Sequence, residues 1–329
     1  MACITITGAR GNLGWKLLCH FVELPDVTKV FGLSRGLPTD AQLSELRSLK
    51  GSDKAEFGQC DLTDFDDVRW RQAIEQSDAV VHLAAQNPFP EATWDDATQS
   101  FDMTLNVALA AVDAGVRRFV FTSSNHVMGR YKDAPLADTI GPGQLTTRLE
   151  HGVGTVWHTG ITPLDSTVYA AVKSAGERLC RSLAIRSKGK TTFVCTRIGW
   201  CQPGENSPTT LSGAGTPTKE SSNEATSDLD LAKSDRWFKM MWLSNSDFNQ
   251  LHEKAIFADS ALWPELCVVV NGMSDNKEMP WSLEEARDWL GYDPVDGIVV
   301  GQVDAAHATS VNRPHGSASQ RGDMKQTLR

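Results

Sequence analysis

Apolar and polar positions alternate in blocks through the first two hundred residues. Short apolar runs, each about as long as a buried strand, are separated by segments in which apolar residues recur every three or four positions. The apolar runs are Ile4–Thr7, Thr28–Leu33, Ala55–Gln59, Ala79–Leu83, Phe119–Thr122 and Thr192–Thr196. The helical segments are Asn12–Val22, Asp66–Ile74, Ala97–Ala114 and Val168–Ala184. This alternation predicts an α/β fold in which a parallel sheet is covered by helices on both faces.

The pattern changes after Trp200. Residues 203–232 are rich in Gly, Ser, Thr and Glu, which is typical of a flexible insertion or of a lid over a substrate. A helical pattern with several aromatic residues follows, then a strand at Leu266–Asn271 and a helix start at Ser282 with Glu285. We therefore divide the chain into a domain over residues 1–200, a smaller C-terminal lobe over 201–304 and a disordered tail over 305–329.

Composition narrows the possible environments and partners. The 329 residues carry a net charge of −9, which argues against a nucleic-acid binder. The sequence contains no long apolar segment and no signal peptide, so we expect no membrane association. The seven cysteines are scattered and form no CxxC pair, which predicts reduced thiols in a cytoplasmic protein and no metal site.

Three glycines, Gly8, Gly11 and Gly14, follow the first predicted strand and open the first predicted helix. Such a turn brings a pyrophosphate close to the backbone, and the helix N-terminus presents free N–H groups to it. A Walker loop is excluded because no Gly-Lys-Ser/Thr follows. The spacing alone is also compatible with a purely structural turn, so the interpretation depends on the rest of the chain.

The end of the second predicted strand indicates which dinucleotide is bound. An acidic residue there would bind the ribose 2′-hydroxyl of NAD, but this chain has Ser34 and Arg35. An arginine fits a 2′-phosphate, which favours NADP as the cofactor, with NAD as the alternative. Asp61, after the third strand, could meet the adenine amino group, and the small Ala84 and Ala85 after the fourth let a cofactor pass closely.

Tyr169 and Lys173 are four residues apart and share one face of a predicted helix. An ammonium beside a phenol favours the phenolate, so we expect a lowered pKa for Tyr169 and a role as general acid or base. Ser123 and Ser124 lie just beyond the fifth strand, where a hydroxyl can orient the same substrate oxygen.

These motifs together resemble the extended short-chain dehydrogenase/reductase family. They are ITGARGNLG, the DL after the third strand, HLAA, Asn106 in DMTLNV, SSNHVMG, YAAVK with SAGE, and RIG at Arg197. The resemblance covers residues 3–201 well and is strongest to uronate dehydrogenases, which oxidise the anomeric carbon of a hexuronate. It implies a Rossmann-type doubly wound parallel sheet with a substrate-capping C-terminal lobe.

The resemblance also assigns roles to individual residues. Ser124, Tyr169 and Lys173 would be catalytic, with Tyr169 taking the hydroxyl proton and Lys173 also holding the nicotinamide ribose. Asn125 and His126 would contact the sugar, and Arg197 would bind its carboxylate. The residues expected to bind the cofactor are Gly8, Arg10, Gly11, Asn12, Leu13, Gly14, Ser34, Arg35, Asp61, Leu62, Leu83, Ala84, Ala85, Asn106 and Lys173.

Some features depart from that pattern. Ser34-Arg35 replaces the acidic residue of an NAD enzyme, and Trp200 stands where a small residue would follow RIG. The stretches 138–167 and 203–232 are longer than usual, so the substrate is less constrained than the cofactor.

The favoured function is that of an NAD(P)-dependent oxidoreductase acting on a sugar-like alcohol or carbonyl. The alternatives are a sugar-nucleotide epimerase with retained NAD and a non-catalytic NADP-binding redox sensor. The expected partner is a small-molecule substrate, and a homodimer through 97–114 and 168–184 is possible in this family.

Overall fold

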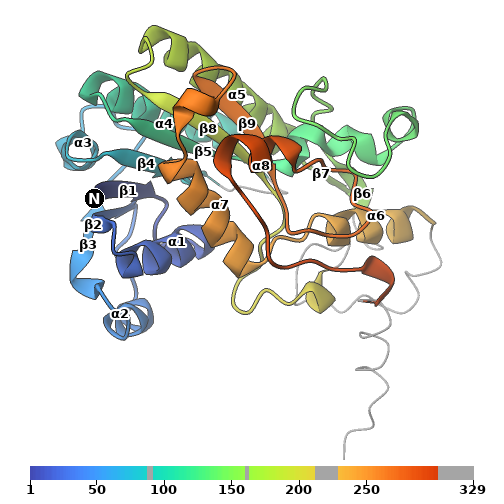
Figure 1. The fold of residues 1–329 in the computed structure, drawn as a ribbon, viewed down its shortest axis with the longest axis horizontal. Coiled ribbons are helices and arrows are strands. Elements are labelled where there is room, and N and C mark those ends of the chain that lie inside the picture. The colour runs from blue at the N-terminus through green and yellow to red at the C-terminus, as the bar shows by residue number, and fades with distance from the viewer. Residues whose placement is uncertain (87–91, 160–162, 212–228, 303–329) are drawn as a thin grey trace, which may run out of the picture.

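In the computed structural model, which describes residues 1–86, 92–159, 163–211 and 229–302, seven parallel strands form one sheet (Figure 1). Their order across the sheet is β3-β2-β1-β4-β5-β8-β9. The strands are β1 (Ala2–Thr7), β2 (Val27–Ser34), β3 (Ala55–Gln59), β4 (Ala79–His82), β5 (Arg118–Ser124), β8 (Thr192–Ile198) and β9 (Cys267–Gly272). The first strand, β1, lies inside the sheet. Strands β2 and β3 are added on one side of it, and the later strands are added on the other side, beginning with β4. Doubly wound sheets bind ligands where the strand order changes in this way, here between β1 and β4.

Helices cover both faces of the sheet, as the alternation of strands and helices predicts. One face is covered by α3 (Val68–Glu75), α4 (Trp94–Ala114) and α5 (Thr167–Arg186). The other is covered by α1 (Asn12–Glu23), α7 (Asn245–Phe257) and α8 (Glu284–Leu290). Successive strand residues point to opposite faces of the sheet. On β5, Phe119 and Phe121 pack on the face covered by α3, α4 and α5, and Val120 packs on the face covered by α1, α7 and α8. The core therefore consists of two apolar layers separated by the sheet.

Two of the differences from the predicted elements have clear local causes. The aromatic helical pattern after residue 235 is two helices, α6 (Leu229–Met240) and α7, because Ser244 accepts the N–H of Asp247 and starts a new helix. Helix α2 (Asp40–Arg47) was not predicted, although Thr39 and Gln42 form a capping box at its start. At Ser282, the hydroxyl accepts the N–H of Glu284.

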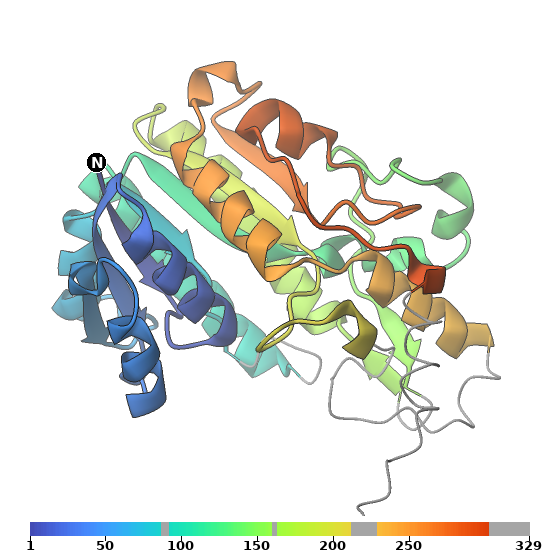
Figure 2. The ribbon, with the colours of Figure 1, turned by 60° about the horizontal axis from the view of Figure 1, so that its bottom comes forward.

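The region after residue 200 is not a separate layer of its own. Its strand β9 pairs with β8 and completes the main sheet. Helix α6 packs against a two-stranded hairpin, β6 (Val156–His158) and β7 (Pro163–Asp165), beyond the C-terminal ends of the main strands (Figure 2). Much of the expected flexible loop, residues 212–228, and the expected tail from 303 lie outside the described residues. The capping role of this lobe and the disorder of the tail stay predictions.

The described part of the chain contains no helix long and apolar enough to cross a membrane. All seven cysteines are free thiols, and the described residues contain no His, Cys, Asp and Glu cluster suited to a metal ion.

Candidate active site

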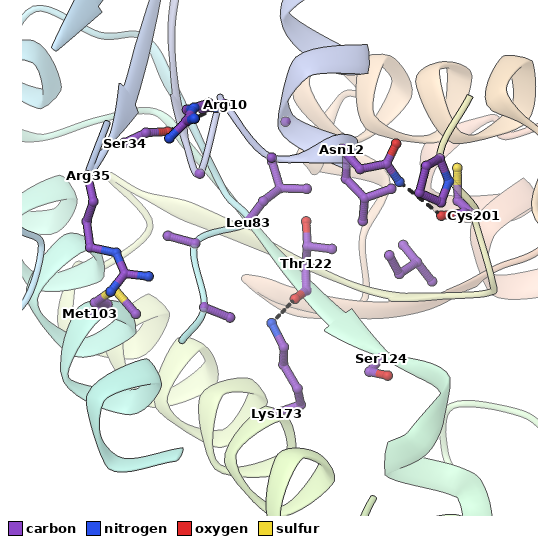
Figure 3. A pocket seen from close by; sticks show the side chains of 18 of the residues that line it. Arg10, Asn12, Ser34, Arg35, Leu83, Met103, Thr122, Ser124, Lys173 and Cys201 are labelled. Carbon is purple, nitrogen blue, oxygen red and sulfur yellow. Dashed lines mark hydrogen bonds between the residues drawn. The ribbon is translucent and has the colours of Figure 1, made fainter. Parts of the chain in front are cut away.

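A cavity of about 1010 Å³ opens at the C-terminal ends of the strands (Figure 3). It runs from Arg10 and Arg35 at one end, past the glycine turn, to Ser124 at the other. Its length spans the switch point between β1 and β4. An elongated cavity in this position fits a dinucleotide and leaves space for a substrate beside it.

The glycine turn is shaped by close backbone contacts. Gly8 has φ +72°, in the left-handed region, and its carbonyl accepts the N–H of Gly11 at 2.9 Å. A Cβ on Gly14 would lie 2.3 Å from the Gly8 oxygen, so no other residue fits there without moving the turn. Gly11 precedes α1 and offers no side-chain cap, which leaves the first N–H groups of the helix available to a phosphate. The turn therefore fits the pyrophosphate of a dinucleotide.

Two arginines define the far end of the cavity. The backbone N–H of Arg10 donates to Ser34 Oγ at 3.0 Å, and Gln42 Nε2 donates to the Arg10 carbonyl at 3.1 Å. A Cβ on Gly36 would lie 2.7 Å from Arg10 Nη1, so the Arg10 guanidinium lies against the β2–α2 loop. Arg35 lines the same end (Figure 3). Among the described residues no carboxylate lines the cavity, so this end is cationic.

Two residues expected to bind the cofactor lie outside the cavity wall. Asp61 accepts both the N–H and the hydroxyl of Thr63, at 2.9 and 2.7 Å, and these bonds lower the pKa of its carboxyl. Asn106 Nδ2 donates to the carbonyls of Leu62 and Thr63 at 3.0 and 3.1 Å. Both side chains thus hold the turn after β3. The other expected cofactor-binding residues line the cavity.

The three expected catalytic residues come together at the other end. Tyr169 and Lys173 lie on the first turns of α5, and Ser124 ends β5. All three line the cavity, and Ser124 hydrogen-bonds to the Tyr169 phenol. Lys173 Nζ donates to the Thr122 carbonyl at 2.7 Å and lies 5.7 Å from the centroid of the Tyr169 ring. This is an arrangement that can transfer a proton to or from a bound hydroxyl.

Burial dominates the acid–base properties of this pair. It raises the pKa of Tyr169 to about 12, with the Ser124 hydrogen bond opposing the shift, and it lowers the pKa of Lys173 to about 8. The spacing of Tyr169 and Lys173 predicts instead that the lysine lowers the pKa of the tyrosine below its usual value. In the structure, the cost of burying a phenolate sets the direction of the shift, and Lys173 Nζ donates to a backbone carbonyl.

Neutral polar groups continue the wall beside Tyr169. Asn125 Nδ2 donates to the Ile198 carbonyl at 2.9 Å. His126 Nδ1 lies 2.7 Å from Thr155 Oγ1 and 3.0 Å from Ser166 Oγ, and burial lowers its pKa to about 3. His126 is therefore an uncharged hydrogen-bonding group at neutral pH.

Arg197 is not at the cavity, contrary to the expectation that it binds a carboxylate of the substrate. Its guanidinium is 1% exposed and pairs with Glu177 through Nε–Oε1 and Nη2–Oε2 contacts of 2.9 and 2.8 Å. Ser123 donates to the same carboxylate at 2.6 Å. Arg197 Nη2 also donates to His151 Nε2 at 2.8 Å, and the other ring nitrogen of His151 is 2.7 Å from Ser174 Oγ. The carboxylate that pairs with Arg197 is therefore that of Glu177, and the two residues form a buried ion pair within the protein.

Substituting Glu177→Gln is expected to lower the free energy of unfolding by about 3–5 kcal/mol, because Arg197 would be left as a buried charge without its counter-ion. Denaturant unfolding measures this loss. The control is Arg181→Ala on the same helix, which removes an exposed pair with Glu265 and should cost under about 1 kcal/mol. If the Glu177 variant kept its stability but bound substrate more weakly, the result would instead indicate that Arg197 binds the substrate.

Several cavity residues were not predicted as site residues: Gly36, Thr39, Gln42, Cys60, Met103, Thr122, Ile198, Gly199, Cys201 and Pro203. The capping box formed by Thr39 and Gln42 is a sequence signal that could have identified these two residues. The segment after β8 is held by two side chains of α1. Asn12 Nδ2 donates to the Cys201 carbonyl at 3.3 Å, and Lys16 Nζ donates to the Gln202 carbonyl at 2.6 Å. No local pattern reveals contacts over such a distance in sequence.

Comparison with known proteins agrees with this geometry. Residues 4–200 match the NAD dependent epimerase/dehydratase family. An NAD-dependent glucose-6-phosphate dehydrogenase of Haloferax volcanii is 31% identical, over 89% of this chain and 93% of that protein. An L-arabinose 1-dehydrogenase (NAD(P)(+)) of the same organism is 30% identical, over 90% and 97%.

Uronate dehydrogenases are also among the relatives. The enzyme of Pseudomonas syringae is 26% identical, over 92% of this chain and 86% of that protein. The structure of a mutated uronate dehydrogenase matches with a TM-score of 0.61 at 22% identity, over 97% of this chain and 89% of that one, and supports the fold alone. The resemblance inferred from the motifs is confirmed: the chain belongs to the NAD dependent epimerase/dehydratase family.

Proposed function

We propose that this oxidoreductase uses NADP in preference to NAD and oxidises a CH–OH group of a sugar held beside Tyr169. The observation that carries the proposal is the position of Ser124, Tyr169 and Lys173 at one end of a cavity whose other end is built for a dinucleotide. The dehydrogenase names of the two Haloferax volcanii relatives support sugar oxidation as the reaction.

The residues of the chain divide the acid–base work. In the direction of oxidation, Tyr169 reacts as the phenolate, whose Oη takes the proton of the sugar hydroxyl, while Ser124 Oγ orients the same oxygen. Lys173, held by the Thr122 carbonyl, places a positive charge near the tyrosine ring that stabilises the phenolate before it takes the proton. A nicotinamide cofactor, when bound in the cavity, supplies the acceptor for the hydride that leaves the sugar carbon.

The preference for NADP is supported by the charges at the far end of the cavity. Arg10 and Arg35 line it, and no acidic side chain among the described lining residues is available for a ribose 2′-hydroxyl. Guanidinium groups pair well with phosphate oxygens, and each such bond to a charged group contributes about 1.5–3 kcal/mol.

Replacing Arg35 by alanine should therefore weaken NADP⁺ binding by about 10- to 100-fold and leave NAD⁺ binding nearly unchanged. Dissociation constants from fluorescence titration check this without any turnover. Arg47→Ala is the control, because Arg47 is exposed on α2 outside the cavity. Equal weakening of both cofactors, or of neither, would contradict a role in binding the 2′-phosphate.

The proposed function is tested by following reduced nicotinamide at its absorbance band, with purified protein, NADP⁺ or NAD⁺, and a panel of aldoses. Steady turnover that is faster with NADP⁺ is the expected result. Protein that arrives with tightly bound NAD and interconverts sugar nucleotides without net reduction would favour the epimerase alternative. Cofactor binding without turnover of any sugar or alcohol would favour the redox sensor. The homodimer through α4 and α5 stays a prediction.

A further inference from the structure

We propose that Gly36 determines the preference for NADP, because its missing side chain leaves space for the guanidinium of Arg10 at the cationic end of the cavity. Gln42 is a positioning residue in the same arrangement, since it holds the backbone of Arg10. This inference rests on the proposed function and specifies which residues decide its choice of cofactor. It is carried by the space at Gly36, the fixed backbone of Arg10 and the charge of this end of the cavity.

Gly36 follows Arg35 in the loop between β2 and α2, and it lines the cavity. A Cβ at this position would lie 2.7 Å from Arg10 Nη1, which is closer than real Cβ atoms approach another heavy atom. The next nearest atoms, Cζ at 3.6 Å and Cδ at 3.8 Å, belong to the same arginine. The space that glycine leaves is therefore occupied by the Arg10 side chain and not by a backbone contact of the fold.

The backbone itself does not require glycine at position 36. The φ angle of Gly36 lies outside the left-handed region, in contrast to that of Gly8. An alanine can therefore adopt the same backbone conformation, and its close contact would be with Arg10. Because that contact involves the far end of a flexible side chain, the arginine would move and the loop would keep its conformation.

The backbone of Arg10 is held on both sides. Its N–H donates to Ser34 Oγ at 3.0 Å, at the end of β2. Its carbonyl accepts Gln42 Nε2 at 3.1 Å, and Gln42 Oε1 accepts the N–H of Thr39 at 3.1 Å, so the two neighbours fix the orientation of this amide. Since the base of the arginine is fixed, a side chain at position 36 would displace its guanidinium relative to a bound cofactor.

This end of the cavity carries the charge that a phosphate needs. Arg10 and Arg35 line it, and no carboxylate is among the described lining residues (Figure 3). The Arg35 carbonyl accepts Gln59 Nε2 at 3.1 Å, which holds the loop from the side of β3. NADP differs from NAD only by a phosphate on the adenosine ribose, so an arginine that contacts this phosphate strengthens the binding of NADP alone. The position of the Arg10 guanidinium therefore controls selectivity.

Dissociation constants of NADP⁺ and NAD⁺ test this inference in four proteins: the unaltered chain, Gly36→Ala, Arg10→Ala and the double variant. Gly36→Ala is expected to weaken NADP⁺ binding about 10-fold and to leave NAD⁺ binding within about twofold. Arg10→Ala should weaken NADP⁺ binding at least as much. In the Arg10→Ala background, Gly36→Ala should have no further effect, because the side chain that it displaces is absent.

Gly141→Ala is the matched control. Gly141 lies outside this cavity, its φ angle is also outside the left-handed region, and a Cβ there would make an ordinary contact with Gln144 at 3.5 Å. The control should change neither dissociation constant. Adenosine 2′,5′-bisphosphate and 5′-AMP repeat the comparison with fragments that lack the nicotinamide, and Gly36→Ala should weaken the binding of the bisphosphate alone.

A second substitution addresses Gln42. Gln42→Met keeps the length of the side chain but removes the amide that holds Arg10. It is expected to weaken NADP⁺ binding about 5-fold, to leave NAD⁺ binding within about twofold, and to have no further effect in the Arg10→Ala background. Equal weakening of both cofactors would mean that Gln42 stabilises the turn as a whole, and its positioning role would be wrong.

The outcomes separate this inference from the proposed function. If Arg35→Ala weakens NADP⁺ binding and Gly36→Ala does not, the role of Gly36 is wrong and the proposed function stands. The same conclusion follows if Gly36→Ala has an equal effect with and without the Arg10 side chain. If the unaltered protein binds NAD⁺ more tightly than NADP⁺, the proposed preference has failed and this inference fails with it, while the turnover assay still decides sugar oxidation.

Discussion

Tyr169→Phe should lower kcat for sugar oxidation by about 10²- to 10⁴-fold and leave NADP⁺ affinity within about twofold of its original value. The substitution removes only the phenol oxygen, which is the group that we propose takes the substrate proton and which hydrogen-bonds to Ser124. The ring remains to fill the cavity wall and to pack beside His126, so the cofactor site is not disturbed. Steady-state kinetics and a cofactor titration on the same preparation measure the two quantities.

Tyr131→Phe is the matched control for this variant. Tyr131 is buried, and its hydroxyl donates to the Glu150 carbonyl at 3.1 Å, outside the cavity. Its loss should cost about 1 kcal/mol of stability and no catalytic rate. A Tyr169→Phe protein that retains most of its kcat would show that another group moves the proton.

The free energy of unfolding is expected to fall by roughly 5 kcal/mol between pH 7 and pH 5, because three histidines are buried in the neutral form. Burial lowers the pKa of His82 and His126 to about 3 and that of His252 to about 4. In the unfolded chain each has a pKa of about 6.5. Below that pH the unfolded state binds more protons than the folded state. The stabilising contribution is therefore complete above pH 6.5 and is lost progressively as the pH falls.

Denaturant titrations at half-unit pH intervals test this expectation. Each histidine contributes about 1.4 kcal/mol per pH unit over that range, so His252→Gln should flatten the slope by that amount. His158→Gln, which changes an exposed residue, should leave the slope as it is. A stability that stays constant down to pH 5 would mean that these imidazoles accept protons without unfolding the chain.

The order of strands and helices could be predicted from the sequence because its signals are local. The glycine turn, for example, depends on Gly8, Gly11 and Gly14, which are close together in the chain and act on each other's backbone. The same holds for Tyr169 and Lys173, whose common helix face follows from a spacing of four. A family resemblance then added Ser124, and the structure brings it to the same end of the cavity.

The failures arise from contacts between residues that are distant in sequence. Arg197 was expected at the substrate because an arginine suits a carboxylate, but the carboxylate that it meets is Glu177 on α5. The pKa of Tyr169 was predicted from its neighbour alone, whereas depth of burial decides its direction. Neither burial nor the direction of a long side chain is encoded in residue spacing.

The bonds from Asn12 and Lys16 to the segment after β8 have a consequence for how this enzyme can diversify. Helix α1, whose N-terminus we propose receives the cofactor phosphates, also holds, through two side chains, the backbone that leads from Trp200 to Gln202. A substitution that changes the conformation of this segment to admit a different sugar would therefore also alter the hydrogen bonds that connect the segment to α1. Under the proposed function, a change of substrate specificity in this segment is therefore expected to alter cofactor affinity as well, through the contacts of Asn12 and Lys16.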